Sequence, residues 1–588
     1  MPNAGPDPSD GASAEAPIER DRPAVDPVAS QPGIAAEVPG AIDPAPPAGP
    51  AAVTAIRAPE RTGRAAALVA TGILASRVLG FVRQGIFSHY FGTSDAADAF
   101  NAAMRIPNFL QNLFGEGVLS ASFIPVYAGL LGRDQREEAD RVAAAVGALL
   151  ALVTATLVAV GMLATPLLVS SVAAGFTGPK RELTTQLVRI AFPGIGLLVM
   201  GAWCLGVLNS HRKFLLSYLA PVASNVVLIA TLLWFGRQQG DARLAVTLAW
   251  GAVVGSAAQL LVQVPTVLRV APGLLRGRTR GGPAGAETRG HVRTVVRNFL
   301  PVLVGRGVVQ ISGYVDNALA SLVASGAVTV FTNAQTLYIL PGSLFGMSVA
   351  AAELPAMARL QGGEAEVAAH LRTRLTAGLR RIAFFIIPSA AAFLALGDVL
   401  AGAVFRYGRF SQADVRWVWG TLAGSAVGLL ASTLGRLYSS AFYALKETRT
   451  PLRFALLRVA LTLGLGYLGA RHAPAWLGID PKWGTAGLTA TAGVAGWVEF
   501  TLLRRALNRR IGVTGVPAAA LARLWGAAGA AAAVGWGVKL ITAGLPALVM
   551  AGLVVGAFGA TYLGATAAMG EGESAAVWAR VRRRLGRR

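Results

Sequence analysis

The sequence predicts an all-α polytopic membrane protein with about fourteen transmembrane helices. Of its 588 residues, 54% are hydrophobic and only 14% are charged, whereas soluble domains carry about 25% charged residues. Apolar runs of roughly 20 residues recur along the chain, and each is long enough to cross the hydrocarbon core of a bilayer. These runs lack the alternation of period two that a membrane β-barrel requires.

Fourteen apolar runs are expected to form the spans. The 70 glycines suit close packing between such helices, because small residues let backbones approach each other. The expected spans, in chain order, are 65–90, 99–129, 142–172, 184–208, 214–236, 244–268, 295–323, 328–358, 380–404, 415–443, 451–470, 483–503, 517–542 and 545–569.

Changes in composition divide the chain into six predicted segments. Residues 1–60 are rich in Pro, Ala and acidic residues and have no apolar period, so we expect a disordered cytoplasmic tail. The other segments are an N-terminal six-helix lobe (61–268), a basic cytoplasmic linker (269–294), a C-terminal six-helix lobe (295–510), two extra transmembrane helices (511–570) and a basic cytoplasmic tail (571–588).

A weak internal repeat supports the two lobes. LFGEGVLSASFIP (113–125) is similar to LFGMSVAAAELP (344–355), and each lies in the second span of a set of six. Both sets begin on the same side of the membrane, so the repeat is parallel. Two such bundles around a central cavity are typical of transporters.

Basic loops predict the topology. Arg-rich loops such as 132–141 and 269–282 follow even-numbered spans, whereas the loop 89–98 contains no Lys or Arg. The positive-inside rule therefore places both termini in the cytoplasm, although the basic stretch 406–416 is an exception to the alternation. The same rule accounts for most of the net charge of +23, so nucleic acid is not an expected partner.

Two arginines interrupt the first span. Arg77 and Arg83 lie within an otherwise apolar run, and each costs roughly 2.5–3.5 kcal/mol near a bilayer centre. Arg83 could lie near the helix end and extend to the headgroups. Arg77 has a turn or more of apolar residues on each side, so we expect it to line a polar cavity.

The second span also contains several polar residues. Asp98, Arg105, Asn108 and Glu116 are candidate substrate-binding residues. Arg105 and Glu116 could instead pair with neighbours for packing. Asp98 could simply complement a helix dipole, because it lies where the span begins.

Charges deep in later spans add to this set. Arg306 and Asp316 lie ten residues apart on the seventh span, about 15 Å along a helix, so each needs a partner elsewhere or water. Arg306 is a further candidate for substrate binding. Because arginine binds phosphate in a bidentate manner, the surplus of basic groups suits a substrate that carries a pyrophosphate.

Enzymatic and metal chemistry are not expected. The sequence contains no Walker motif and no nucleophile elbow. The five histidines are scattered and have no metal-ligand spacing. The single cysteine, Cys204, lies in an apolar run and is expected to be a packing residue. We therefore expect no cofactor and no metal.

Several motifs resemble the lipid II flippases (MurJ/MviN) of the multidrug/oligosaccharidyl-lipid/polysaccharide exporter superfamily. They are SRVLGFVRQ (76–84), FGTSDAADAF (91–100) and RIPNFLQNLFGEGVLSASFIPVY (105–127), and the similarity continues through FRYGRFSQADV (405–415) and AFYALKETRTP (441–451). The resemblance implies fourteen helices in two lobes that alternate access, and a groove for the lipid tail formed by the last two helices.

The resemblance also implies a function and a set of partners. The substrate would be lipid II, the undecaprenyl-pyrophosphate-linked precursor of peptidoglycan, moved from the inner to the outer leaflet of the bacterial cytoplasmic membrane. Membrane lipids and cell-wall synthesis proteins are further expected partners, and the chain is expected to be a monomer. The alternatives are an exporter of another polyprenyl-linked glycan and, from the same superfamily, a drug or cation antiporter, which a cavity rich in arginine disfavours.

The chain departs from the family pattern at two places. Gln111 and Asn112 stand where the family usually has arginines after the Pro-Asn pair, and Gln335 and Thr336 stand where span eight commonly has one. We expect Arg306 to supply some of the charge that these positions lack.

Overall fold

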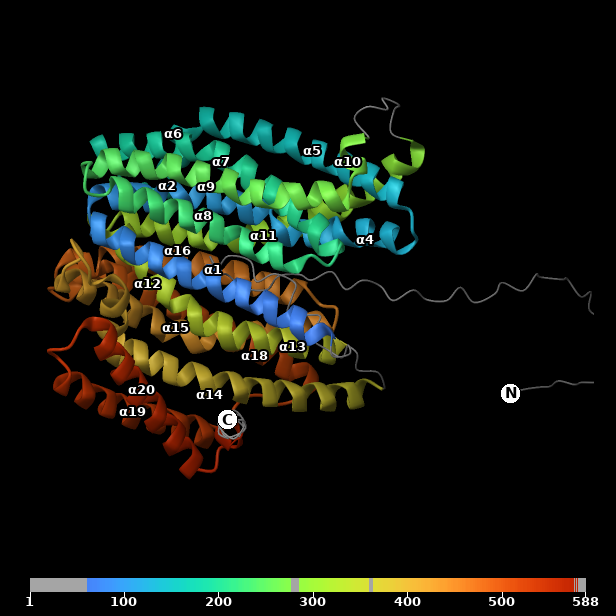
Figure 1. Cartoon of the computed structure of the whole chain (residues 1–588). Coiled ribbons are helices and arrows are strands. Elements are labelled where there is room, and N and C mark those ends of the chain that lie inside the picture. Colours follow the sequence, from blue (N-terminus) through green and yellow to red (C-terminus); the bar gives the residue numbers. More distant parts are fainter. Residues whose placement is uncertain (1–60, 277–284, 359–362, 576, 578, 580–588) are drawn as a thin grey trace, which may run out of the picture. The chain divides into compact units, whose positions relative to one another are not determined.

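The computed structural model describes residues 61–276, 285–358, 363–575, 577 and 579 (Figure 1). The predicted tail 1–60, part of the basic linker and residues 580–588 lie outside the described residues. The helices are α1 Arg61–Phe91, α2 Asp95–Phe114, α3 Glu116–Ser122, α4 Ile124–Gly132, α5 Arg136–Leu163, α6 Thr165–Val172, α7 Gly178–Ser210, α8 Phe214–Phe235, α9 Asp241–Val270, α10 Gly273–Arg276, α11 Ala286–Ser321, α12 Ala327–Pro341, the π-helix Gly342–Gly346, α13 Met347–Ala358, α14 Glu364–Phe405, α15 Gln412–Ala444, α16 Arg449–Arg471, α17 Ala473–Trp476, the 3₁₀ turn Pro481–Trp483, α18 Gly484–Ile511, α19 Ala518–Ile541 and α20 Ala547–Ala568.

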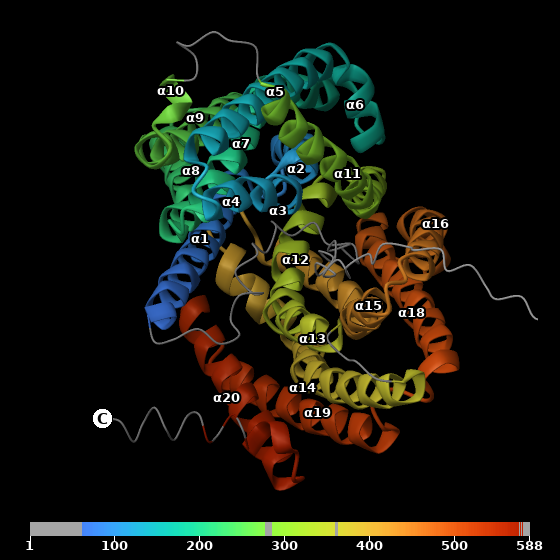
Figure 2. The ribbon, with the colours of Figure 1, turned by 90° about the vertical axis from the view of Figure 1, so that its right-hand side faces the viewer.

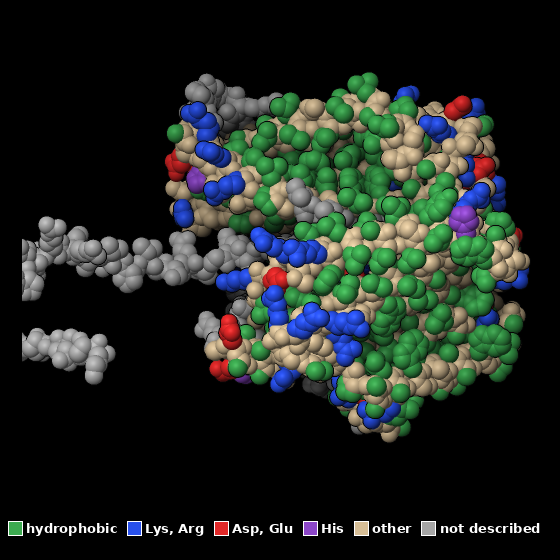
Figure 3. All heavy atoms as spheres, turned by 180° about the vertical axis from the view of Figure 1, so that it is seen from behind, with side chains coloured by type: hydrophobic (Ala, Val, Ile, Leu, Met, Phe, Trp, Pro, Cys, Tyr) green, Lys and Arg blue, Asp and Glu red, His purple; other side chains and the backbone are tan. Residues whose placement is uncertain are grey.

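Helices occupy all fourteen of the expected spans. Within the described residues, eleven helical stretches are long and apolar enough to cross a membrane. The other three expected spans correspond to α1, α11 and the pair α12–α13. Hydrophobic side chains cover the middle of the face in Figure 3, and Lys and Arg side chains lie mainly toward its ends. This distribution is the one that a polytopic membrane protein requires.

Local capping fixes where two of the helices begin. Ser94 precedes α2, and its hydroxyl accepts a hydrogen bond from the backbone N–H of Ala97 at 3.3 Å. Ser411 and Asp414 form a capping box at the start of α15. Such caps satisfy backbone donors that have no partner within the helix.

Both copies of the LFG repeat mark an interruption of a helix. In the first copy, α2 ends at Phe114 and Gly115 separates it from α3. In the second copy, the π-helix ends at Gly346. A Cβ atom at Gly115 would lie 2.1 Å from the carbonyl oxygen of Gln111, and one at Gly346 would lie 2.3 Å from Cγ2 of Thr433. A larger residue would therefore collide with the backbone of α2 at Gly115 and with the Thr433 side chain at Gly346.

The buried apolar side chains form two large clusters. One contains buried residues between Phe87 and Val295, and the other contains buried residues between Ala327 and Tyr562. In Figure 2, α5, α7, α8 and α9 lie together, apart from α14, α19 and α20. Contacts of α1 with both α8 and α14, and of α11 with both α2 and α16, join the two groups of helices.

Candidate functional site

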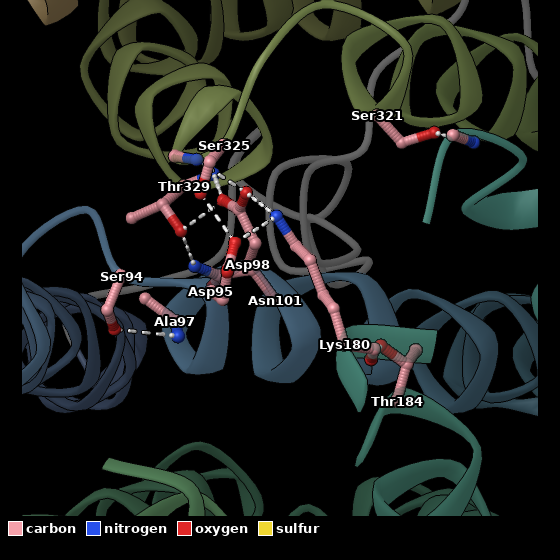
Figure 4. A network of polar contacts seen from close by, with 12 residues as sticks. Ser94, Asp95, Ala97, Asp98, Asn101, Lys180, Thr184, Ser321, Ser325 and Thr329 are labelled. Atoms are coloured by element: carbon pink, nitrogen blue, oxygen red, sulfur yellow. Dashed lines mark hydrogen bonds and ion pairs between the residues drawn. The ribbon is translucent and has the colours of Figure 1, made fainter. Parts of the chain in front are cut away.

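Asp98 lies at the centre of a polar network (Figure 4). This network joins the first half of the chain, α1 to α9, to the second half, α11 to α20. The Asp98 side chain is fully buried. It accepts hydrogen bonds from the backbone N–H groups of Gly326 at 2.7 Å and Thr329 at 2.8 Å, and from the Thr329 hydroxyl at 2.8 Å. Lys180 of α7 donates to the same carboxylate at 2.7 Å. A buried carboxylate with four donors is well compensated for its loss of water.

The neighbours of Asp98 extend this network. Asn101 donates to the Thr329 hydroxyl at 3.2 Å, and the second acid, Asp95, pairs with Lys180 at 2.8 Å. We use the term Asp98 network for the following residues: Asp95, Asp98, Asn101, Lys180, Ser325, Gly326 and Thr329.

Further contacts join the halves at the same end of the bundle. The hydroxyl of Thr93 donates to Asp414 at 3.0 Å, and the backbone N–H of Arg409 donates to the carbonyl oxygen of His89 at 3.0 Å. Asn317 donates to the carbonyl oxygen of Val172, also at 3.0 Å. At the opposite end, the ion pairs Arg510–Glu447, Arg374–Glu353 and Arg380–Glu571 each join residues of the second half.

Arg77 of α1 contacts the interrupted eighth span. Nη1 of Arg77 donates to the hydroxyl of Ser343 in the π-helix at 2.9 Å. Two turns farther along α1, Gln84 donates to Asn333 of α12 at 2.8 Å, and both side chains are buried. Polar side chains of α1 and of span eight therefore contact each other where the two halves meet. We call these residues, Arg77, Gln84, Asn333 and Ser343, the seam.

A cavity lies between α2 of the first half and α11, α12, α15, α16 and α18 of the second. Its glycine-lined wall includes Gly428 and Gly493, where α15 and α18 approach closely. The polar residues that line it are Arg105, Asp316, Gln335, Tyr338, Ser425, Ser432, Arg458 and Thr489.

Four charged residues form what we call the charge cluster: Arg105, Asp316 and Arg458 line this cavity, and Glu499 pairs with Arg458. Nη1 of Arg458 donates to Glu499 at 3.1 Å, and their side chains are 12% and 9% exposed. Asp316 interacts electrostatically with both Arg458 and Arg105. Asp316 thus interacts with an arginine of the first half and with an arginine of the second.

The structure distributes the seven predicted site residues over several places. Arg105 lines the cavity, Arg77 lies on the seam with span eight, and Asp98 lies in its own network at one end. Arg83 is half-buried and Asn108 is exposed. Two predicted residues, Glu116 in α3 and Arg306 in α11, have side chains outside the described set.

Five charged residues of these sites are not among the predicted site residues, and Lys180 and Arg458 are two of them. Lys180 lies in the first turn of α7, which begins six residues before the expected span, so the predicted span boundary leaves it in a loop. Arg458 lies near the basic start of α16, where arginines ordinarily extend toward the headgroups. One sequence feature does indicate that Arg458 lies inside the membrane. It follows Arg449, the first residue of α16, by nine residues, which is about two and a half helical turns.

Comparison with known proteins identifies the family. The model of the family described as lipid II flippase MurJ matches residues 87–561. The chain belongs to the lipid II flippase MurJ family. Its relatives include the probable lipid II flippase of Rhizobium meliloti, 30% identical over 74% of this chain and 79% of the relative. Another is the lipid II flippase of Burkholderia cenocepacia, 30% identical over 76% of this chain and 84% of the relative.

Solved structures agree on the fold. A lipid II flippase MurJ in an inward closed conformation superposes with a TM-score of 0.69 at 21% identity, covering 86% of this chain and 98% of that one. An inward-facing multidrug transporter of the MATE family gives a TM-score of 0.58 at 19% identity, over 74% of this chain and 95% of that one. The all-helical polytopic fold is therefore confirmed. Members of the MurJ family are multi-pass transporters of the bacterial cytoplasmic membrane rather than enzymes.

Proposed function

We propose that this protein moves lipid II from the inner to the outer leaflet by alternating access of two six-helix lobes. Membership of the MurJ family supports the substrate. The observation that carries the mechanism is the cavity between α2 and the helices of the second half, which is lined by charged residues from both halves. A pyrophosphate is the part of lipid II that arginines in such a cavity would bind.

The contacts between the halves support one state of the cycle. The Asp98 network and the Thr93–Asp414 hydrogen bond join the halves at the end where α2, α12 and α15 begin. In the proposed topology, with both termini in the cytoplasm, this end faces outward. The state described here is then closed to the outside, and transport requires these contacts to break.

The predicted binding residues have separate roles in this proposal. Arg77, Arg83 and Arg105 attract the anionic headgroup, and Asn108, Glu116 and Arg306 contribute to the same path. Asp98 holds the two halves together in the outward-closed state. The protein acts as a monomer, and its partners beyond lipid II are membrane lipids and cell-wall synthesis proteins.

Complementation tests this function. The gene should restore growth to bacteria depleted of their own lipid II flippase, and lipid II should become accessible at the outer leaflet. The control is a strain that carries the Arg77→Ala variant at matched protein level. Absence of rescue by well-expressed wild-type protein, with accumulation of a different polyprenyl-linked glycan in its own host after depletion, would favour the alternative substrate.

A further inference from the structure

Arg458 combines three features that a binding residue for an anion requires. It lines the cavity, its side chain is almost buried, and one nitrogen of its guanidinium already has a partner in Glu499. Its Nε is buried and makes no hydrogen bond to any described residue. The guanidinium therefore retains an unused donor while it is held in place through Nη1.

Asp316 is bound less firmly than Glu499. Its Oδ1 is buried and has no hydrogen-bond partner among the described residues, although the side chain interacts electrostatically with Arg458 and Arg105. A buried polar atom without a hydrogen-bond partner destabilises the state that contains it. The Oδ1 atom of Asp316 thus lacks the hydrogen bond to a described residue that an oxygen of a well-placed anion would form.

We propose that Arg458 binds a phosphate group of the transported lipid, and that Asp316 takes the place of that phosphate when the cavity is empty. This inference rests on the proposed function. In the empty state, Asp316 and Glu499 compensate Arg105 and Arg458, which keeps buried arginines from being left without counter-charge. When a phosphate enters, it accepts hydrogen bonds from Arg458 and displaces Asp316, while Glu499 continues to hold the guanidinium.

The position of Gln335 agrees with this assignment. Gln335 lines the same cavity as Arg458, and it is one of the two neutral residues at the place on span eight where we expected an arginine. A cationic group from α16 therefore faces the same space that the missing side chain of α12 would have faced. Arg458 in this way supplies a positive charge where span eight lacks one, and the contribution of Arg306 stays a prediction.

A binding measurement separates this role from a structural one. Full-length protein in nanodiscs is titrated with purified lipid II and followed by native mass spectrometry, and thermal unfolding is recorded in parallel. The variants are Arg458→Gln, the double variant Arg458→Gln/Glu499→Gln, and Asp316→Asn. The double variant is the matched control, because it removes the arginine without leaving Glu499 as an unpaired buried charge.

Three results are expected. Arg458→Gln weakens lipid II binding about tenfold or more, the amount expected for a lost charge-assisted hydrogen bond. The double variant recovers most of the thermal stability but stays about tenfold weaker in binding. Asp316→Asn binds lipid II severalfold more tightly than the wild type, because the competing carboxylate is gone.

Two results would overturn the inference. One is wild-type affinity in the double variant, which would leave Arg458 as a structural partner of Glu499. The other is unchanged or weaker binding by folded Asp316→Asn protein. If that variant does not fold, the two Arg458 variants decide the matter. Failure of the proposed function has a different signature, since the wild-type protein itself would then not bind lipid II.

Discussion

Asp98 of α2 accepts a hydrogen bond of 2.7 Å from the backbone N–H of Gly326, directly before α12 begins. The same carboxylate also accepts from the backbone N–H of Thr329. These amides belong to the first turn of α12, where backbone donors lack partners within the helix. Asp98 thus caps a helix of the other half of the chain, so the capping interaction exists only while the halves are together.

Asp98→Asn should lower the thermal stability of the protein. The two carboxylate oxygens of Asp98 accept hydrogen bonds from four donors, whereas an asparagine side chain has only one acceptor oxygen. The lost hydrogen bonds should lower the free energy of unfolding by about 1–3 kcal/mol. Asp95→Asn is the control, because the Asp95 side chain is 64% exposed and exposed pairs contribute little. Thermal unfolding in detergent measures both variants. Equal losses in the two would show that burial of Asp98 is unimportant.

Arg77→Ala should abolish lipid II transport while the protein still inserts into the membrane. Arg77→Lys should restore transport only in part, because lysine keeps the charge but loses the planar fork of arginine. Ser343→Ala serves as the control, since it removes the 2.9 Å hydrogen bond of Arg77 but not its charge. Outer-leaflet accessibility of lipid II, normalised to protein level, is the readout. If Ser343→Ala is as inactive as Arg77→Ala, the role of Arg77 is structural.

Gly428→Ala should destabilise the second half of the protein. A Cβ at Gly428 would lie 2.5 Å from Cα of Gly493, so α15 and α18 would have to move apart, and overpacking of this kind typically costs about 1–3 kcal/mol. Gly464→Ala in α16 is the matched control, because no atom of another described helix lies within 4 Å of its Cβ position. We expect a lower unfolding temperature for the first variant alone. Similar values for both would contradict the close packing of α15 on α18.

Cysteine labelling should establish the proposed topology. On a Cys204→Ala background, a membrane-impermeant maleimide should label Leu477→Cys in cells with an intact cytoplasmic membrane but should not label Gly285→Cys. Both positions are exposed, so permeabilised cells should label at each and provide the control for reactivity. Labelling at position 285 in intact cells would reverse the assigned orientation.

His211 should make stability depend on pH. It lies between α7 and α8, its ring contacts the Tyr127 hydroxyl at 2.9 Å, and burial lowers its pKa below the ordinary 6.5. The unfolded chain therefore binds a proton more readily than the folded one, and stability should fall as the pH drops below about 6.5. The unfolding temperature of His211→Gln should decline less between pH 7.5 and 5.5 than that of the wild type. Parallel curves for the two proteins would exclude this contribution.

Hydrophobic runs were sufficient to predict the spans because each must satisfy its backbone hydrogen bonds inside the membrane, and a helix does so within one segment. The expected span 214–236 and the observed α8, Phe214–Phe235, differ by one residue. Pairings between distant helices left no comparable signal. Lys180 and Thr329 both bind Asp98, yet nothing in their sequence neighbourhoods indicates that they meet.

Arg458 shows why the candidate site was harder to predict than the fold. An arginine near a basic helix end can extend to the headgroups or point inward, and sequence spacing alone does not decide between the two. The decision depends on Glu499 of the neighbouring α18, which holds the guanidinium inside. Arg105, by contrast, could be predicted because it lies on a span with many other polar residues.

The charge cluster has an electrical consequence. When all four of its residues are ionised, the two arginines and two carboxylates sum to zero net charge. A membrane potential acts on net charge, with about 2.3 kcal/mol per elementary charge for each 100 mV. In the proposed transport cycle, the membrane potential would therefore exert no net force on these four residues when the cavity is empty, and it would act at this site only when an anionic substrate is bound.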